Sequence, residues 1–115
     1  MASRTSNEFL LRESDFGRIH VETDLVRRIV ERAAVTVDGI NEATATVEKT
    51  AADSPLKIRF NLTLGQDYSV NDVSSDLVKA VRKILQESLE IIEVEIYVRV
   101  TDIKRKAEKN KRRVR

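Results

Sequence analysis

Apolar and polar residues alternate along four stretches of this chain, and a period of two predicts β-strands that bury one face. These stretches lie at about residues 18–22, 43–48, 56–64 and 92–102. The third is the clearest, because an apolar residue occupies every second position without a break. We therefore expect four strands, each with one apolar and one wet face.

Two further stretches carry apolar residues at the three- and four-residue spacing of an amphipathic helix. The first begins at Thr23, whose hydroxyl can cap it, and ends near Gly39, a residue suited to a left-handed terminal conformation. The second begins at Asn71, a second capping residue, and closes near Leu89. Because Lys, Arg and Glu fill the opposite sides, we expect each helix to bury one stripe.

The predicted order is βαββαβ, and a two-layer α+β sandwich buries all six apolar faces at once. We expect a four-stranded, mainly antiparallel sheet with both helices on one face, the ferredoxin-like arrangement. If the stretch at 18–22 is too short to pair, a three-stranded KH-like layout remains as the alternative.

A single domain is predicted at residues 17–103, since 115 residues suit one modest core. Residues 1–16 are interpreted as a flexible N-terminal arm, in which Phe9, Leu10, Leu11 and Phe16 dock on the body. Residues 104–115 are interpreted as a basic disordered tail.

This tail changes the picture of a chain with a net charge of only +2. It carries eight cations and one acid, so its charge is +7 and the remaining 103 residues carry −5. The cations attract any polyanion, whether nucleic acid or anionic lipid, unless they serve only as a solvated, solubilising end. They are Lys104, Arg105, Lys106, Lys109, Lys111, Arg112, Arg113 and Arg115.

Candidate catalytic and cofactor chemistry is sparse. The single histidine, His20, falls on the wet side of a strand, and cysteine is absent, so no nucleophilic triad or thiolate metal site is expected. Glu93 and Glu95 share one strand face, but nearby cations make ordinary cross-strand charge pairing the better interpretation. We therefore predict no enzyme, no cofactor, no metal and no small-molecule substrate.

The open face of the predicted sheet is the remaining candidate contact surface. Its residues are Lys57, Arg59, Glu93, Glu95, Tyr97 and Arg99. A sheet that binds RNA stacks bases on two or three aromatic residues, and this face offers only Tyr97. RNA binding through the basic tail is the alternative function.

Membrane insertion has no direct signal in these 115 residues. No apolar run approaches the roughly 20 residues that span a bilayer, and the first residues lack the apolar core of a signal peptide.

The segment from Gly17 to Ile40 resembles the opening of the alkaline shock protein family, in which a Gly-x-Ile-x-Ile strand leads into a helix ending in Ala-Ala. The positions in register are Gly17, Ile19, Val21, Ile29, Ala33, Ala34, Gly39 and Ile40. The helix with Val73, Leu77, Val81 and Ile84 and the closing strand at 92–98 are also similar, so the likeness covers about residues 16–103. The Phe16-Gly17 entry and the basic end resemble the soluble part of the family's membrane-anchoring member.

This resemblance implies a non-catalytic protein of the envelope stress response of Gram-positive bacteria. It implies homo-oligomers, contacts with related alkaline shock proteins, and a place at the cytoplasmic side of the membrane, next to its anionic surface. It also implies a membrane segment before residue 1. The function expected is that of a protein-interaction or membrane-anchoring adaptor.

Overall fold

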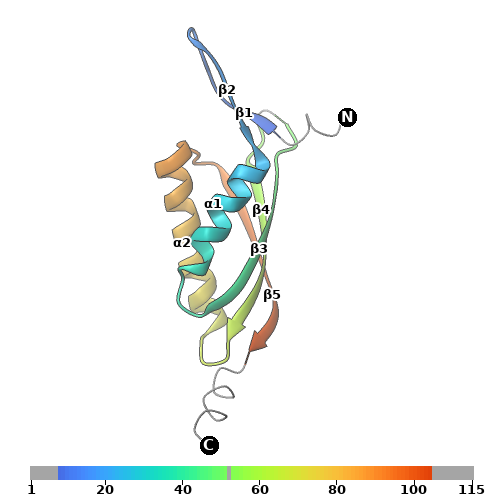
Figure 1. Ribbon diagram of the computed structural model, residues 1–115, viewed down its shortest axis with the longest axis vertical. Coiled ribbons are helices and arrows are strands. Elements are labelled where there is room, and N and C mark those ends of the chain that lie inside the picture. Colours follow the sequence, from blue (N-terminus) through green and yellow to red (C-terminus); the bar gives the residue numbers. More distant parts are fainter. Residues whose placement is uncertain (1–7, 52, 105–115) are drawn as a thin grey trace, which may run out of the picture.

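The computed structural model describes residues 8–51 and 53–104, which form five strands and two helices (Figure 1). The elements in chain order are β1 (Glu8–Ser14), β2 (Gly17–Glu22), α1 (Thr23–Val35), β3 (Ile40–Glu48), β4 (Leu56–Gly65), α2 (Val70–Leu89) and β5 (Val94–Lys104).

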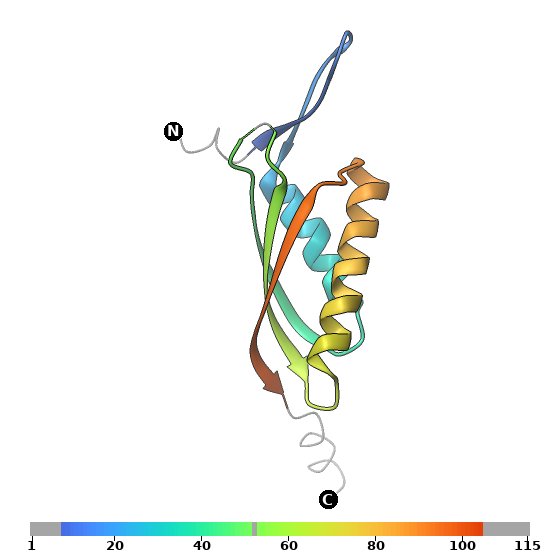
Figure 2. The ribbon, with the colours of Figure 1, turned by 180° about the vertical axis from the view of Figure 1, so that it is seen from behind.

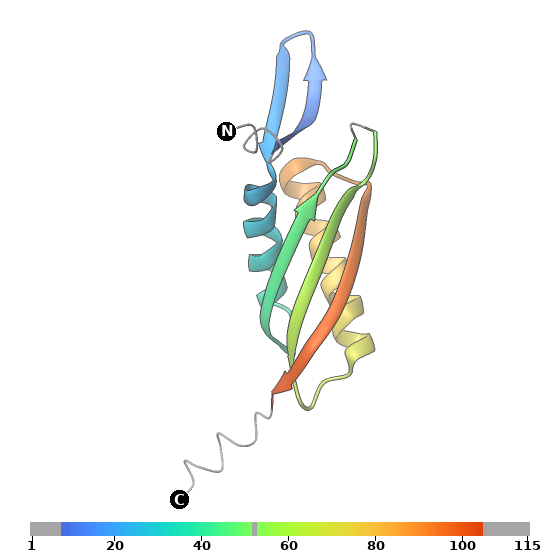
Figure 3. The same ribbon diagram turned by 90° about the vertical axis from the view of Figure 1, so that its right-hand side faces the viewer.

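The main sheet has three strands in the order β3-β4-β5, and both helices cover one of its faces (Figure 3). β3 and β4 form an antiparallel hairpin, whereas β5 runs parallel to β4. The α+β class and the helices on one face are confirmed. The expected four-stranded, mainly antiparallel sheet is wrong, and the strand count matches the three-stranded alternative. α2 returns the chain along the sheet before β5 begins, and such a crossover joins parallel strands.

The core lies between the sheet and the helices, and β4 is its centre. Five alternating residues of β4 are almost fully buried: Leu56, Ile58, Phe60, Leu62 and Leu64. They meet Val26, Val30 and Ala34 of α1 and Val73, Leu77, Val81 and Leu85 of α2. Each large side chain buried in this way contributes about 1.5–3 kcal/mol.

The remaining strands, β1 and β2, pair with each other in a separate hairpin that projects beyond the start of α1 (Figures 1 and 2). The expected flexible arm is therefore wrong for residues 8–14, which form a strand, while residues 1–7 lie outside the described part. Phe9 and Leu11 pack against the core as expected. Phe16 does not, because the two-residue turn carries it to the tip, where it is fully exposed.

The ends of the helices differ from the expectation by a few residues. Glu22 is the N-cap of α1, and Ser69 rather than Asn71 caps α2, accepting a hydrogen bond from the Asp72 N–H at 3.3 Å. α1 ends at Val35, before Gly39.

Gly39 nevertheless adopts the left-handed conformation, with φ of 98°, in the loop between α1 and β3. Its carbonyl accepts the Gly65 N–H at 2.8 Å, which draws this loop against the end of β4. A Cβ on Gly39 would lie 2.7 Å from Cγ of Tyr68 and 2.9 Å from Cγ2 of Val73.

Gly39→Ala is expected to destabilise the fold by roughly 1–3 kcal/mol, because the new methyl combines backbone strain with a steric overlap. Urea denaturation followed by circular dichroism measures the change. Gly17→Ala is the control: φ there is also positive, at 141°, but a Cβ meets nothing within 4 Å. Equal losses in the two variants would show that the contact with Tyr68 is unimportant.

One side chain of α1 closes part of the free edge of β3. Glu31 accepts the Ala45 N–H through Oε2 at 2.7 Å and a hydrogen bond from Nη1 of Arg27 through Oε1 at 3.0 Å. β3 is an edge strand, whose outward N–H groups lack strand partners. Glu31 therefore both anchors α1 and protects this edge.

Glu31→Ala is expected to destabilise the protein by about 1–3 kcal/mol, because it leaves the buried Ala45 N–H without an acceptor. Glu31→Gln keeps an acceptor oxygen and should lose less. Denaturant midpoints of the two variants and the wild type give the comparison. If both substitutions leave the midpoint unchanged, the hydrogen bond to Ala45 contributes nothing to stability.

Candidate functional site

The open sheet face brings together five of the six residues predicted there. Lys57 lies opposite Glu95, and Arg59 lies opposite Tyr97, across the parallel β4–β5 pair. Arg99 follows on the same face of β5. The sixth residue, Glu93, precedes β5, and its backbone carbonyl accepts the Leu56 N–H at 3.1 Å.

The strand register places oppositely charged residues next to one another on part of this face. Lys57 lies between Glu48 of β3 and Glu95 of β5 in the strand register. The Tyr97 hydroxyl donates to Oε1 of Glu95 at 3.2 Å. Cross-strand neighbours of opposite charge contribute about 0.2–1 kcal/mol where they pair, so the face suits sheet stability and weak polar contacts.

Other predicted residues stand apart from any shared site. His20 is exposed on the projecting hairpin. Lys104 is the exposed last residue of β5, and the other seven cations of the tail lie outside the described residues. Within residues 8–51 and 53–104, no three His, Cys, Asp or Glu side chains gather in a way that could hold a metal ion.

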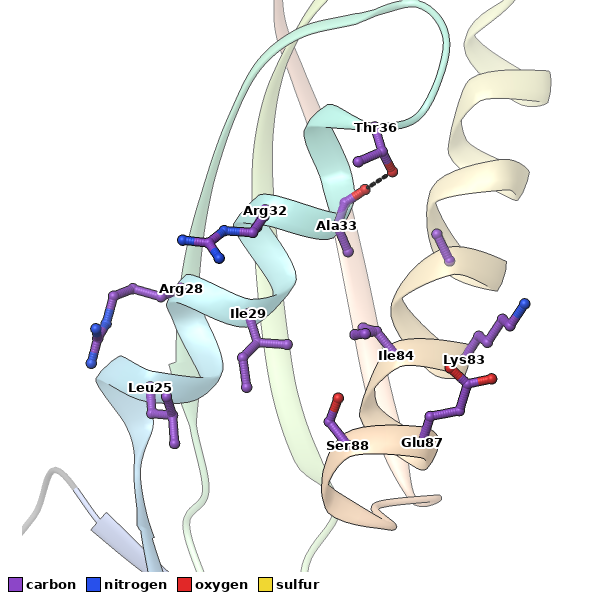
Figure 4. Close-up of a pocket in the computed structure, with 11 residues that line it drawn as sticks. Leu25, Arg28, Ile29, Arg32, Ala33, Thr36, Lys83, Ile84, Glu87 and Ser88 are labelled. Atoms are coloured by element: carbon purple, nitrogen blue, oxygen red, sulfur yellow. Dashed lines mark hydrogen bonds between the residues drawn. The ribbon is translucent and has the colours of Figure 1, made fainter.

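A groove of about 630 Å³ lies between the facing sides of α1 and α2 (Figure 4). Its apolar lining comes from both helices: Leu25, Ile29 and Ala33 of α1, and Ala80 and Ile84 of α2. Its polar lining is Arg28, Arg32, Thr36, Lys83, Glu87 and Ser88. We call this hollow the inter-helix groove.

The residues that line this groove were present in the predicted apolar stripes of the two helices, but the stripes alone did not show that a groove forms. Ile29, Ala33, Ala80 and Ile84 belong to the predicted apolar stripes, but they face the neighbouring helix rather than the sheet. Each stripe was therefore wider than packing on the sheet requires.

The polar lining of the groove carries three cations and one acid, Glu87. Arg28 is paired with Asp24, with 3.2 Å between Nε and Oδ2, and Arg27 holds the same carboxylate at 2.6 Å. Arg32 and Lys83 form no ion pair with any residue that the structure describes. The pKa of Asp24 is lowered, chiefly because the Arg27 guanidinium donates hydrogen bonds to the carboxylate.

A second hollow, of about 440 Å³, lies where the base of the hairpin meets the segment between α2 and β5. Phe9 and Leu11 line it from the hairpin, and Ile91 and Ile92 line it from that segment. An ion pair between Arg12 and Glu90 joins the two parts. Glu90 has a left-handed φ of 58°, a conformation that costs a residue with a side chain about 1–2 kcal/mol.

The described part of the chain has no helix long and apolar enough to cross a bilayer. The chain matches no protein-family model and no curated protein sequence at the significance that we required.

Solved structures of one kind of domain share the fold. A triple variant of the MamM C-terminal domain is 13% identical, covers 71% of this chain and 96% of that chain, and gives a TM-score of 0.51. A copper form of a second variant is also 13% identical, with 72% and 100% coverage and a TM-score of 0.52. A nickel form of a third variant is also 13% identical, covers 70% of this chain and 99% of that chain, and gives a TM-score of 0.50. At this identity the likeness shows the α+β fold alone.

Asp24→Asn is expected to lower the melting temperature at pH 7, because it removes the negative charge that pairs with Arg27 and Arg28. A depressed pKa in the folded state means that the stabilisation is present above the unfolded value of about 3.9. It is lost as the pH falls through the lower folded value. Circular dichroism melts should therefore show a gap between variant and wild type that closes in acid.

The control for this titration is Asp38→Asn in the loop after α1, where the carboxylate has no ion pair within the described residues. A gap for Asp24→Asn that is constant from pH 7 into acid would show that the carboxylate's charge has no role.

Proposed function

We propose that this chain is an alkaline-shock-type domain that acts, without catalysis, as a protein-interaction or membrane-anchoring adaptor at the cytoplasmic side of a Gram-positive cell membrane. The residues that resemble the family support this proposal. Half of them occupy core or turn positions of the fold, among them the buried Val21, Ala34 and Ile40 and the left-handed Gly39.

The observation that carries the proposal is apolar surface left uncovered at two separate places. Phe16 is 100% exposed at the hairpin tip, and Leu25 at the inter-helix groove is 39% exposed. A fully exposed aromatic side chain is a candidate anchor for a protein contact, since aromatic residues carry much of the binding energy at interfaces. A catalytic site instead needs converging ionisable groups in a cleft, and the groove offers mainly arginine and lysine above an aliphatic floor.

The partners proposed are related alkaline shock proteins, further copies of this chain, and an anionic membrane surface. The basic tail follows Lys104 at the end of β5, which lies at the end of the domain opposite the hairpin (Figure 1). Each cation near an anionic surface contributes about 1 kcal/mol. Membrane and protein contacts thus fall at opposite ends.

The whole chain is expected to co-sediment with vesicles that contain phosphatidylserine and to bind a related alkaline shock protein in a pull-down. Deleting residues 105–115 leaves β5 intact, and this deletion should abolish vesicle binding and leave the protein contact. Raising the salt concentration should weaken only the vesicle contact, because it is electrostatic.

Phosphatidylcholine vesicles, which carry no net charge, are the matched control. A chain that binds neither anionic vesicles nor related proteins would refute the proposal. So would a tight, sequence-dependent affinity for RNA at physiological salt, which would make the tail a nucleic-acid contact.

A further inference from the structure

The hairpin tip is built to present one aromatic side chain. Ser14 and Gly17 close a two-residue turn, and Oγ of Ser14 accepts the Phe16 N–H at 3.2 Å. Phe16 points into solvent, and Ile19 beside it is 51% exposed. Aromatic residues are frequent anchors of protein interfaces because they bury a large area with few rotatable bonds.

The hairpin contacts the rest of the domain at its base. Phe9 and Leu11 pack against the core, and Arg12 pairs with Glu90 at the end of α2. An element fixed before binding loses little conformational freedom when it docks. The base of the hairpin is therefore anchored to the domain, and the tip projects from this anchored base.

The inter-helix groove complements this tip in shape and charge. Its volume of about 630 Å³ is ample for an aromatic ring, and its floor is aliphatic. Arg32, on the α1 side of the groove, lacks an ion-pair partner among the described residues, and Asp15 beside Phe16 lacks one as well. Opposite charges therefore flank two complementary apolar surfaces.

The tip cannot reach the groove of its own molecule. β2 has six residues and runs directly into α1, so at roughly 3.3 Å per residue the turn lies about 20 Å beyond the start of that helix. The hairpin points away from both helices in every view (Figures 1, 2 and 3). A tip that enters this groove must belong to another molecule.

We propose that Phe16 of one copy inserts between α1 and α2 of a second copy, with Asp15 facing Arg32, so that copies join head to tail. This contact rests on the proposed function as an interaction domain and names the surfaces for one of its partners. The two contacting surfaces differ, so the contact is heterologous and can build chains or rings.

Sedimentation velocity of the whole chain over a range of concentrations tests the contact. The wild type should associate, and Phe16→Ser should weaken association by about tenfold or more, as loss of an aromatic anchor does. Ile103→Ser is the matched control: Ile103 is 50% exposed on β5, outside both surfaces, and its loss should change nothing.

Charge reversal tests the pairing itself. Asp15→Lys and Arg32→Glu should each weaken association, and the double variant should recover it. Both positions are exposed, so the variants should fold, which circular dichroism confirms.

Complementation tests the direction of the contact. Leu25→Glu places an acid in the groove, so this variant and Phe16→Ser should each be monomeric alone. Mixed together, they should form one-to-one dimers and nothing larger, because only one tip and one groove remain functional. Longer assemblies in the mixture would refute the head-to-tail contact.

A wild type that is monomeric at all concentrations, or a Phe16→Ser variant that associates like the wild type, would overturn this inference. The vesicle and pull-down experiments separate failure of the tip-and-groove contact from failure of the proposed function. If related proteins and anionic vesicles still bind, the proposed function stands and only the tip-and-groove contact falls.

Discussion

The fold depends on one constraint, which is that β4 presents five large apolar side chains on a single face. These residues, at positions 56, 58, 60, 62 and 64, are at most 2% exposed, and no single helix is wide enough to cover them. Both helices must therefore lie on that face (Figure 3). α2 spans the sheet between β4 and β5, so β5 returns parallel to β4. The opposite face of the sheet is left to charged and hydroxyl side chains.

Covering β4 leaves the helices with more apolar surface than the sheet uses. Val26, Val30 and Ala34 suffice for the contact of α1 with the core, and Leu25 and Ile29 then face α2 across the inter-helix groove. The hairpin has the same property at its far end, because Phe9 and Leu11 secure its base and Phe16 stays outside. Such surplus is typical of a domain that completes its burial with a partner.

Periodicity predicts best where burial decides the structure, and β4 and the two helices are correct for that reason. Strand β1 was missed because Phe9, Leu10 and Leu11 form a run rather than an alternation. The structure explains this run by a register shift between Leu10 and Arg12. The direction of β5 and the pairing of β2 depend on tertiary competition among strands, which an alternating pattern does not encode.

The residues of the open face were predicted correctly except Glu93, but the inter-helix groove was not predicted. Periodicity gives the width of an apolar stripe on a helix, and it does not show which element covers that stripe.

The two ends of the domain offer contacts of different physical kinds, and this difference suits an adaptor. Beyond Lys104 the chain is cationic, so any contact there is long-ranged, unspecific in shape and weakened by salt. At the hairpin tip the exposed feature is a single ring beside one acid, so a contact there would be short-ranged and would need a matching hollow. The rigid sheet keeps these ends apart, because β4 and β5 pair along ten positions from Leu56 to Gly65. Binding at one end therefore leaves the other free, and a surface coated by the tails would present its hairpins and grooves to the next layer of protein.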